Sequence, residues 1–173
     1  MNLLITCARY LESETEEEIR HILNEIGDPE PIIIITNMSG ILTVKTVVNP
    51  TAVVERFKEK MSDEPWSIRY CLRVIPIQKV TRTEITSIEE EVKKMIQFMA
   101  DNESYRITIE KRNSDISSQE LITRIARNIK NRVSLEHPDK ILLIEILENI
   151  TGISIIKKSE ILSVEKFKRD SSE

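Results

Sequence analysis

Tyr105-Arg-Ile-Thr-Ile-Glu-Lys-Arg112 is the stretch that decides the fold of the second half of this chain. β-Branched residues fill its middle, which predicts a short strand, and the strand ends on two adjacent cations. A helix is predicted from Ser117 to about Val133, and Pro138-Asp-Lys140 then turns the chain. Two apolar strands follow and meet near Gly152. The order strand, helix, strand, strand predicts a compact α/β unit.

The predicted helix that begins at Ser117 has one apolar and one basic side. Ser117 is a suitable N-cap, and Glu120 three residues later completes the pattern of a capping box. Apolar residues recur at three- and four-residue spacing on one side, namely Leu121, Ile122, Ile125 and Ile129. The opposite side carries Arg124 and Arg127. We therefore expect the helix to bury one face and to present cations on the other, where they serve either a ligand or ordinary solubility.

The first half of the chain shows the order strand, helix, strand, strand, helix, strand. The expected ranges are 3–9, 14–26, 31–36, 41–47, 50–61 and 68–74. Apolar residues at helical spacing support both helices, and two β-branched runs separated by Asn37-Met-Ser-Gly40 predict a hairpin. This order is βαββαβ, the order of a ferredoxin-like unit. The expected fold class of the whole chain is therefore α+β.

Length and composition fit two small packed units. A chain of 173 residues can bury one good core or two small ones, and its 40% hydrophobic and 31% charged content lies near the globular average. Between the two patterns, residues 76–86 resemble a connector, and an amphipathic helix is predicted at 87–99. We expect a ferredoxin-like domain over 1–80, a second domain over 81–168 and a flexible tail over 169–173.

Charge is distributed unevenly along the chain. A formal net charge of −4 argues against indiscriminate binding to nucleic acid. Acid is concentrated early, in Glu12, Glu14, Glu16, Glu17 and Glu18. Residues 106–140, in contrast, hold eight Lys or Arg against five Asp or Glu, an excess of three. A local basic patch can therefore exist on an acidic protein.

The sequence offers few residues for catalysis. Only His21 and His137 are available for acid–base catalysis at neutral pH, and neither has a neighbouring carboxylate or nucleophile at a telling spacing. Cys7 and Cys71 are too few for a disulfide framework or a zinc site, so both are expected to be reduced thiols in or near strands. The longest apolar run, residues 31–36, is far shorter than the roughly 20 residues needed to cross a bilayer. We expect a cytoplasmic protein that is not an enzyme and has no cofactor, metal or membrane contact.

The second half of the chain resembles a THUMP domain. The likeness rests on Tyr105–Arg112, the Ser117 helix, Pro138-Asp-Lys140, Leu143-Ile-Glu145 and Gly152-Ile-Ser-Ile-Ile156. The ferredoxin-like half is similar to the unit that accompanies THUMP in tRNA-modifying proteins. The join between the two halves also looks like that of the small THUMP protein that assists tRNA cytidine acetylation, through Arg73-Val-Ile-Pro-Ile77, Lys79 and Arg82.

This resemblance implies a tRNA-binding adaptor. The two units would grip the acceptor stem and the single-stranded 3′ end of tRNA and present a distant nucleotide to a catalytic domain. We expect no fused catalytic domain, so the resemblance implies a separate tRNA-modifying enzyme, with an RNA cytidine acetyltransferase as the candidate. The alternative is a protein–protein scaffold without direct RNA contact, in which the first sheet or its acidic helix docks a partner. An enzyme of a fold not identified from the sequence is the remaining class.

The residues predicted to contact RNA are cations near strand ends and on the exposed side of the Ser117 helix. Arg and Lys engage phosphates and unstacked bases through forked hydrogen bonds and point charges. The primary candidates are Lys111, Arg112, Arg124, Arg127 and Lys140, and the secondary ones are Lys157 and Lys158. A continuation across the boundary would use Arg69, Arg73, Lys79 and Arg82, which can equally be salt-bridged or solvated. Together they are expected to line one continuous groove.

Overall fold

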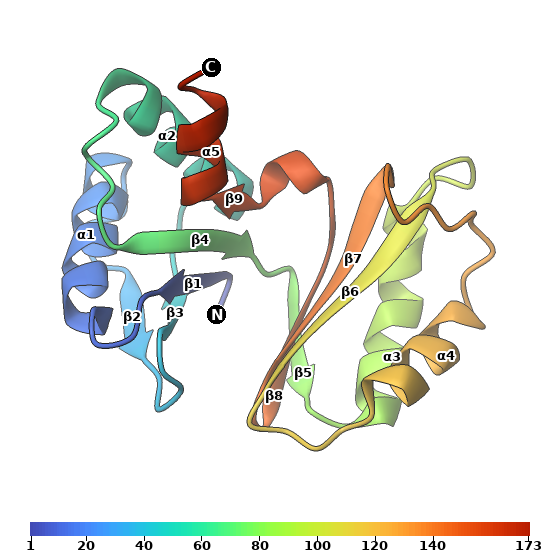
Figure 1. The fold of residues 1–173 in the computed structure, drawn as a ribbon. Coiled ribbons are helices and arrows are strands. Elements are labelled where there is room, and N and C mark those ends of the chain that lie inside the picture. The colour runs from blue at the N-terminus through green and yellow to red at the C-terminus, as the bar shows by residue number, and fades with distance from the viewer. The chain divides into compact units, whose positions relative to one another are not determined.

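The computed structural model describes all 173 residues, and they form two units (Figure 1). The first unit comprises Met1–Ile77 together with Ser159–Glu173, and the second comprises Gln78–Lys158. The boundary expected at residue 80 therefore lies close to the observed one. The second unit ends earlier than the expected residue 168, because the chain after Lys158 returns to the first sheet.

The first unit has the predicted order of strands and helices. Its elements are β1 (Leu3–Cys7), α1 (Glu12–Glu25), β2 (Ile32–Ile35), β3 (Ile41–Lys45), α2 (Pro50–Asp63) and β4 (Cys71–Pro76). With a C-terminal strand, β9 (Leu162–Ser163), the sheet has the strand order β2-β3-β1-β4-β9, and all neighbouring strands are antiparallel. One face packs on the helices around the fully buried Phe57. The mixed α+β class is thus confirmed, and the assignment of this unit as ferredoxin-like stays a prediction.

The C-terminal segment is part of the first unit. A short 3₁₀ turn, η2 (Lys158–Glu160), leads into β9 (Leu162–Ser163) and α5 (Val164–Asp170). β9 pairs with β4, and Leu162 and Val164 are buried in the first core. Most of the segment after the last predicted strand is therefore ordered by apolar burial, and only its final residues extend beyond the helix.

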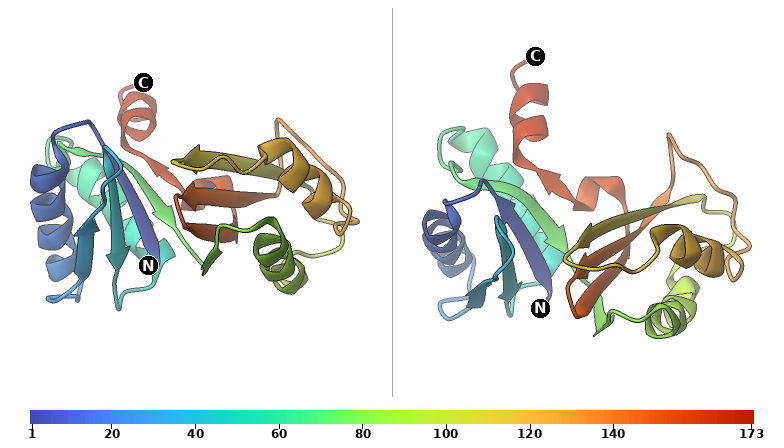
Figure 2. Two further views of the ribbon diagram at one scale, coloured as in Figure 1. Left: turned by 90° about the horizontal axis from the view of Figure 1, so that it is seen from below. Right: turned by 60° about the horizontal axis from the view of Figure 1, so that its bottom comes forward.

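The second unit consists of a four-stranded sheet and two helices. Its elements are β5 (Lys79–Arg82), α3 (Ile85–Met95), the 3₁₀ turn η1 (Ile96–Phe98), β6 (Tyr105–Arg112), α4 (Ser118–Ala126), β7 (Lys140–Leu147) and β8 (Ile150–Ile156). The strand order is β5-β8-β7-β6, with β6 and β7 parallel and the other pairs antiparallel (Figure 2). β5 lies in the stretch predicted to be a connector, because four residues are too few to show a period.

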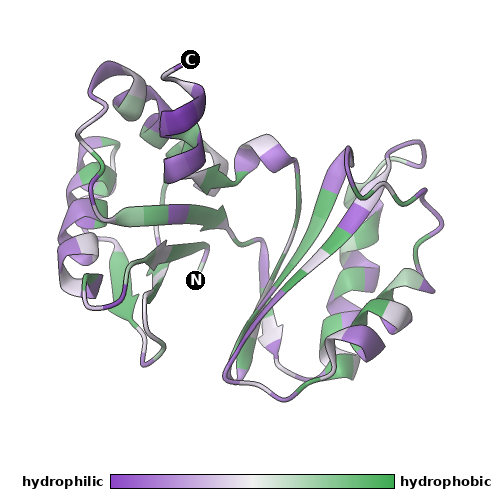
Figure 3. Cartoon of the chain, in the orientation of Figure 1, coloured by the Kyte–Doolittle hydropathy of each residue, from purple (hydrophilic) through white to green (hydrophobic).

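Apolar periodicity places the core of the second unit. Ile88 and Val92 of α3 and Leu121 and Ile125 of α4 pack with alternate residues of β7 and β8. These two strands are apolar along most of their length (Figure 3). α3 and α4 therefore cover the same face of the sheet. No helix in either unit combines the length and the apolar character that a bilayer span requires.

α4 ends earlier than predicted. The sequence predicts a helix to about Val133, but α4 stops at Ala126. The Asn128 side chain donates to the carbonyl oxygen of Arg124 at 3.0 Å, and the Asn131 side chain donates to those of Ala100 and Glu103, each at 2.8 Å. Asparagine side chains compete in this way with the helical backbone pattern, so a pattern of apolar spacing alone overestimates the helix.

Candidate nucleic-acid interface

The register of the second sheet divides its cations between two ends. Because β6 and β7 are parallel, Tyr105 lies beside Lys140, and Arg112 lies beside Leu147. We call these the Tyr105 end and the Arg112 end of the sheet. Seven residue steps of roughly 3.3 Å separate them, or roughly 23 Å. Residues near one end therefore cannot contact the same phosphate as residues near the other.

The predicted contact residues do not form one group. Lys111, Arg112 and Arg82 lie at the Arg112 end, because β5 runs beside β8 with Arg82 opposite Ile150. Lys140 lies at the Tyr105 end, where Lys157 and Lys158 also follow the last residue of β8. The predicted contacts of the second unit therefore fall into two groups at opposite ends of the sheet, and the single continuous groove stays a prediction. The physical reason is the parallel pairing, which brings the start of β7 to the start of β6.

Arg112 forms an ion pair with a buried carboxylate. Its Nη1 atom lies 2.7 Å from Oε2 of Glu145, whose side chain is 0% exposed, while that of Arg112 is 23% exposed. The neighbouring Lys111 is exposed, and its ammonium donates to the carbonyl oxygen of Ile116 at 2.9 Å. The two adjacent cations thus differ in role, because residues on a strand alternate between its faces.

Two further predicted contacts are also paired with acids. Arg124 Nε lies 2.8 Å from Glu89 Oε2 and so connects α4 to α3. Burial raises the pKa of Glu89, but hydrogen bonding from Asn128 and the charges of Arg124 and Lys93 outweigh it and leave the pKa below its ordinary value. Lys140 Nζ lies 3.8 Å from Glu103 Oε2.

The other predicted cations are distributed over both units. Arg127 is exposed just after the last residue of α4. Lys79, Arg82, Lys157 and Lys158 are exposed in the second unit. In the first unit, Arg73 is half-buried in β4, and Arg69, exposed before β4, has its backbone N–H bonded to Glu18.

The structure adds three cations at the Tyr105 end that the sequence analysis did not select. Arg106 is exposed at the second position of β6, and its Nη1 donates to the carbonyl oxygen of Leu135 at 3.1 Å. Lys130 and Arg132 are exposed in the segment between α4 and β7. The run Lys130-Asn-Arg132 could have indicated this group of cations. The sequence analysis predicted it as helix, however, and in a helix the side chains of Lys130 and Arg132 would point in different directions.

Hydrogen bonds hold the segment between α4 and β7 at the Tyr105 end. Tyr105 N–H donates to the carbonyl oxygen of Arg132 at 2.9 Å, and Ser134 N–H donates to that of Tyr105 at 3.0 Å. Asp139 accepts from the backbone N–H and the hydroxyl of Ser104 at 2.8 and 3.0 Å. These two bonds, the backbone one foremost, lower the pKa of Asp139 against the effect of its desolvation. The segment is therefore positioned by named bonds although it has no regular structure.

The acidic run of the first unit is largely used inside that unit. Glu12 Oε1 accepts from the backbone N–H of Gly40 at 2.8 Å, and Glu16 pairs with Arg20 at 2.9 Å. The Glu18 carboxylate accepts from the backbone N–H groups of residues 69–71, which lead into β4. Glu14 and Glu17 remain exposed on α1. The acids that appear as one cluster in the sequence thus include three with structural partners.

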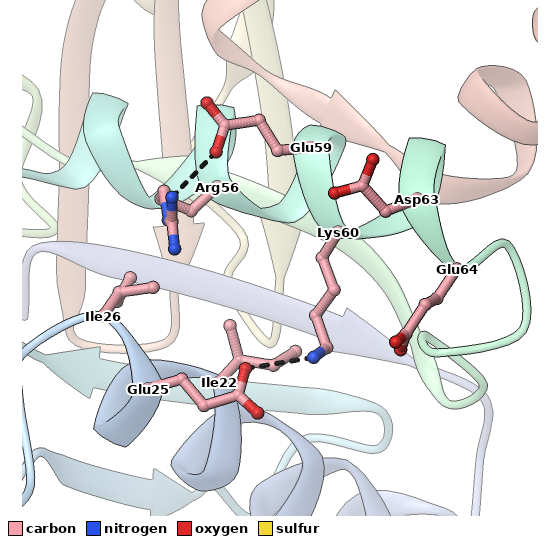
Figure 4. Close-up of a pocket in the computed structure, with 8 residues that line it drawn as sticks. All are labelled: Ile22, Glu25, Ile26, Arg56, Glu59, Lys60, Asp63 and Glu64. Atoms are coloured by element: carbon pink, nitrogen blue, oxygen red, sulfur yellow. Dashed lines mark hydrogen bonds and ion pairs between the residues drawn. The ribbon is translucent and has the colours of Figure 1, made fainter.

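A pocket between α1 and α2 in the first unit is also rich in acids (Figure 4). Lys60 bridges to Glu25 at 3.0 Å, and Arg56 pairs with Glu59 at 2.9 Å. Two more carboxylates, from Asp63 and Glu64, line the same pocket. Its four acids outnumber its two cations, so its charge is unsuited to a phosphate group.

The histidines and cysteines form no metal-binding cluster. His21 is exposed on α1, and its Nε2 lies 2.9 Å from Glu25 Oε1. His137 is exposed before β7. Cys7 and Cys71 are free, buried and opposite each other on β1 and β4, which confirms the prediction of thiols in strands. No group of three or more His, Cys, Asp or Glu residues is placed to hold a metal ion.

Residues 82–156 match the family model of the THUMP domain. The matched residues fall entirely within the second unit and include β6, β7, β8 and both helices. Over 151 residues the chain is 24% identical to the uncharacterized protein MJ0421 of Methanocaldococcus jannaschii. The aligned region covers 82% of this chain and 42% of that protein.

Two solved structures share the fold. PH1313 from Pyrococcus horikoshii superposes with a TM-score of 0.66 and 18% identity, over 91% of this chain and 55% of PH1313. TrmN from Thermus thermophilus superposes with a TM-score of 0.59 and 11% identity, over 90% of this chain and 45% of TrmN. The chain thus spans about half the length of the proteins it matches.

Proposed function

Because residues 82–156 of this chain form a THUMP domain, we propose that the protein binds RNA and that its target is tRNA. The observation that carries the proposal is the coincidence of the family match with the unit that presents exposed cations. Arg106, Arg127, Lys130 and Arg132 are all exposed there, and none takes part in an ion pair of the structure. Exposed cations without an ion-pair partner remain available to attract phosphate.

Binding of tRNA is tested by fluorescence anisotropy with labelled total tRNA over a series of salt concentrations. We expect saturable binding that weakens as salt rises, because each neutralised phosphate releases a counterion. A duplex DNA of similar length is the comparison, and it should bind more weakly. If the anisotropy of the labelled tRNA does not rise on addition of the protein even at about 50 mM salt, the proposal is overturned.

We further propose that the acceptor stem and the single-stranded 3′ end are the parts of tRNA that are bound. The support is the THUMP resemblance, together with the chemistry of a single strand, which offers phosphates, 2′-hydroxyls and unstacked bases to Arg and Lys. Removing the last four nucleotides of tRNA should then weaken binding by about tenfold, the equivalent of one charged contact. A trimmed tRNA that binds as well as the intact one would place the footprint elsewhere.

The finer proposal is that the protein presents tRNA to a separate modifying enzyme, with an RNA cytidine acetyltransferase as the candidate. Its support is the likeness between residues 73–82 and the join in the THUMP protein of cytidine acetylation. The expected result is that the acetyltransferase modifies tRNA faster when this protein is added, while the protein alone leaves the mass of tRNA unchanged in the presence of acetyl-CoA and ATP. Equal acetylation with and without the protein would contradict the adaptor role.

A protein–protein scaffold remains the second candidate. Glu14 and Glu17 are the exposed members of the acidic run on α1, and they are the only support for it. The scaffold predicts co-purification with a basic protein after nuclease treatment, together with no RNA binding. The tRNA titration therefore separates the two functions.

A further inference from the structure

Three of the five primary contact candidates already have a carboxylate partner. Arg112, Arg124 and Lys140 are paired with Glu145, Glu89 and Glu103, respectively. Glu145 is buried, so Arg112 cannot turn to a phosphate without removing a charge partner from a buried carboxylate, whereas Glu89 and Glu103 are partly exposed. These cations therefore have a structural use that competes with RNA.

The cations at the Tyr105 end differ in this respect. Arg106 bonds only to the neutral carbonyl oxygen of Leu135, which leaves its charge uncompensated and its other N–H groups available. Lys130 and Arg132 are exposed, and no hydrogen bond or ion pair of their side chains is present in the structure. The charge of Arg132 contributes to the lowered pKa of Asp139, after the hydrogen bonds from Ser104, but the two side chains form no ion pair.

The backbone bonds of Tyr105 bring Arg106 and Arg132 together. Val133 forms a parallel bridge with Tyr105, so Arg132 precedes the bridge and Arg106 follows it. Because extended residues alternate between two faces, both arginines lie on the face opposite to the Tyr105 side chain, which is buried in the core. Diagonal neighbours on paired extended chains are about 7–8 Å apart. One strand of nucleic acid can therefore contact both.

The segment that carries these residues is held in place before any ligand binds. Asn131 bonds to the carbonyl oxygens of Ala100 and Glu103, and Asp139 bonds to Ser104, so both halves of the segment are tied to the loop before β6. A site ordered in advance loses less conformational entropy on binding.

We propose that a strand of RNA binds the Tyr105 end of the second sheet, through phosphate contacts of Arg106, Lys130 and Arg132. This inference rests on the proposed RNA-binding function and assigns it a surface. It also assigns Arg112 and Arg124 a structural role in place of direct contact.

The test removes the charge of two cations that have no ion pair in the folded state. Lys130→Gln/Arg132→Gln is compared with Lys93→Gln/Lys94→Gln, which gives the same net charge by removing two exposed cations of α3 that are each paired with a glutamate of that helix. The probe is a fluorescein-labelled single-stranded RNA of about 12 nucleotides, measured by anisotropy over a salt series. We expect the first variant to bind at least tenfold more weakly and its salt dependence to fall by about 1.4 in slope, because two single-strand phosphate contacts are lost. The α3 variant should bind like the wild type.

Equal affinity of wild type and Lys130→Gln/Arg132→Gln for the single strand would overturn the assigned surface while leaving RNA binding intact. Failure of the wild type to bind any RNA would instead overturn the proposed function and this inference with it. If the α3 variant loses as much affinity for RNA, the weaker binding of Lys130→Gln/Arg132→Gln would follow from net charge alone, and the assigned surface would be overturned.

Discussion

At the scale of single residues, the partner of a cation decides its role more than its position in the sequence. Lys111 and Arg112 are adjacent and were equivalent candidates. In the structure Arg112 faces the buried Glu145, and Lys111 is exposed with a bond to the carbonyl oxygen of Ile116. A test of RNA binding that reverses both charges therefore disturbs the fold through Arg112, and Lys111 has to be changed alone.

We predict that Arg112→Met lowers the free energy of unfolding by about 3 kcal/mol, because the buried Glu145 loses the guanidinium 2.7 Å away. Chemical denaturation followed by circular dichroism measures the change. Lys111→Met is the matched control and should change stability by less than about 0.5 kcal/mol. Adding Glu145→Gln to Arg112→Met should recover part of the loss, and a double variant less stable than Arg112→Met would show that Glu145 depends mainly on other groups.

Asp139 gives a prediction about acid pH. Hydrogen bonds from Ser104, the backbone one foremost, lower the pKa of Asp139 below its ordinary value. Its stabilising contribution is therefore present above the unfolded pKa, about 3.9, and is lost as pH falls through the lower folded pKa. We expect the melting temperature of Asp139→Asn to lie below that of the wild type at neutral pH and the gap to narrow near pH 3. A gap that is constant over this range would mean that the charge of Asp139 is not what stabilises the loop.

At the scale of elements, the hairpin between β2 and β3 depends on a glycine. Gly40 has a φ of +74°, and a Cβ atom built on it would collide with the backbone carbonyl oxygen of Cys7. Its own backbone is bonded on both sides, since Cys7 N–H donates to its carbonyl oxygen and its N–H donates to Glu12. The turn therefore joins the hairpin to the strand β1 and to the start of α1.

We predict that Gly40→Ala destabilises the protein more than Gly27→Ala. Both glycines have positive φ, but a Cβ on Gly27 would meet no atom within 4 Å. Gly27→Ala should cost about 1 kcal/mol from backbone strain alone, and Gly40→Ala should cost about 2–4 kcal/mol because a backbone oxygen must also move. Denaturant midpoints measured on both variants decide the order, and equal losses would show that the Cys7 carbonyl group yields easily.

At the scale of the whole molecule, the chain leaves the first unit after Ile77 and comes back to it at Ser159. The return adds β9 to the edge of β4 and buries Leu162 in the first core. The last residues of the chain therefore stabilise the unit formed by the first ones, although the sequence analysis assigned most of them to the second domain.

Leu162→Ala tests this return. Leu162 is 1% exposed, so its truncation should lower the free energy of unfolding by about 2–4 kcal/mol. Lys166→Ala, on the solvent side of α5, should have an effect below about 0.5 kcal/mol. Hydrogen exchange resolved by mass spectrometry should locate the loss in β4 and β1, and a loss confined to the second unit would contradict the observed division of the chain.

The sequence alone determined the order of strands and helices over residues 1–77, the mixed α+β class and the THUMP likeness of the second unit, because periodicity and turn residues act over a few neighbouring positions. It did not determine where α4 ends, since Asn131 bonds to residues almost thirty positions earlier. Nor did it determine which cations share an end of the sheet or that Leu162 belongs to the first core. These two features depend on the register of the strands and on the C-terminal segment that pairs with β4. Both involve residues far apart in sequence and are decided only by the packing of the folded chain.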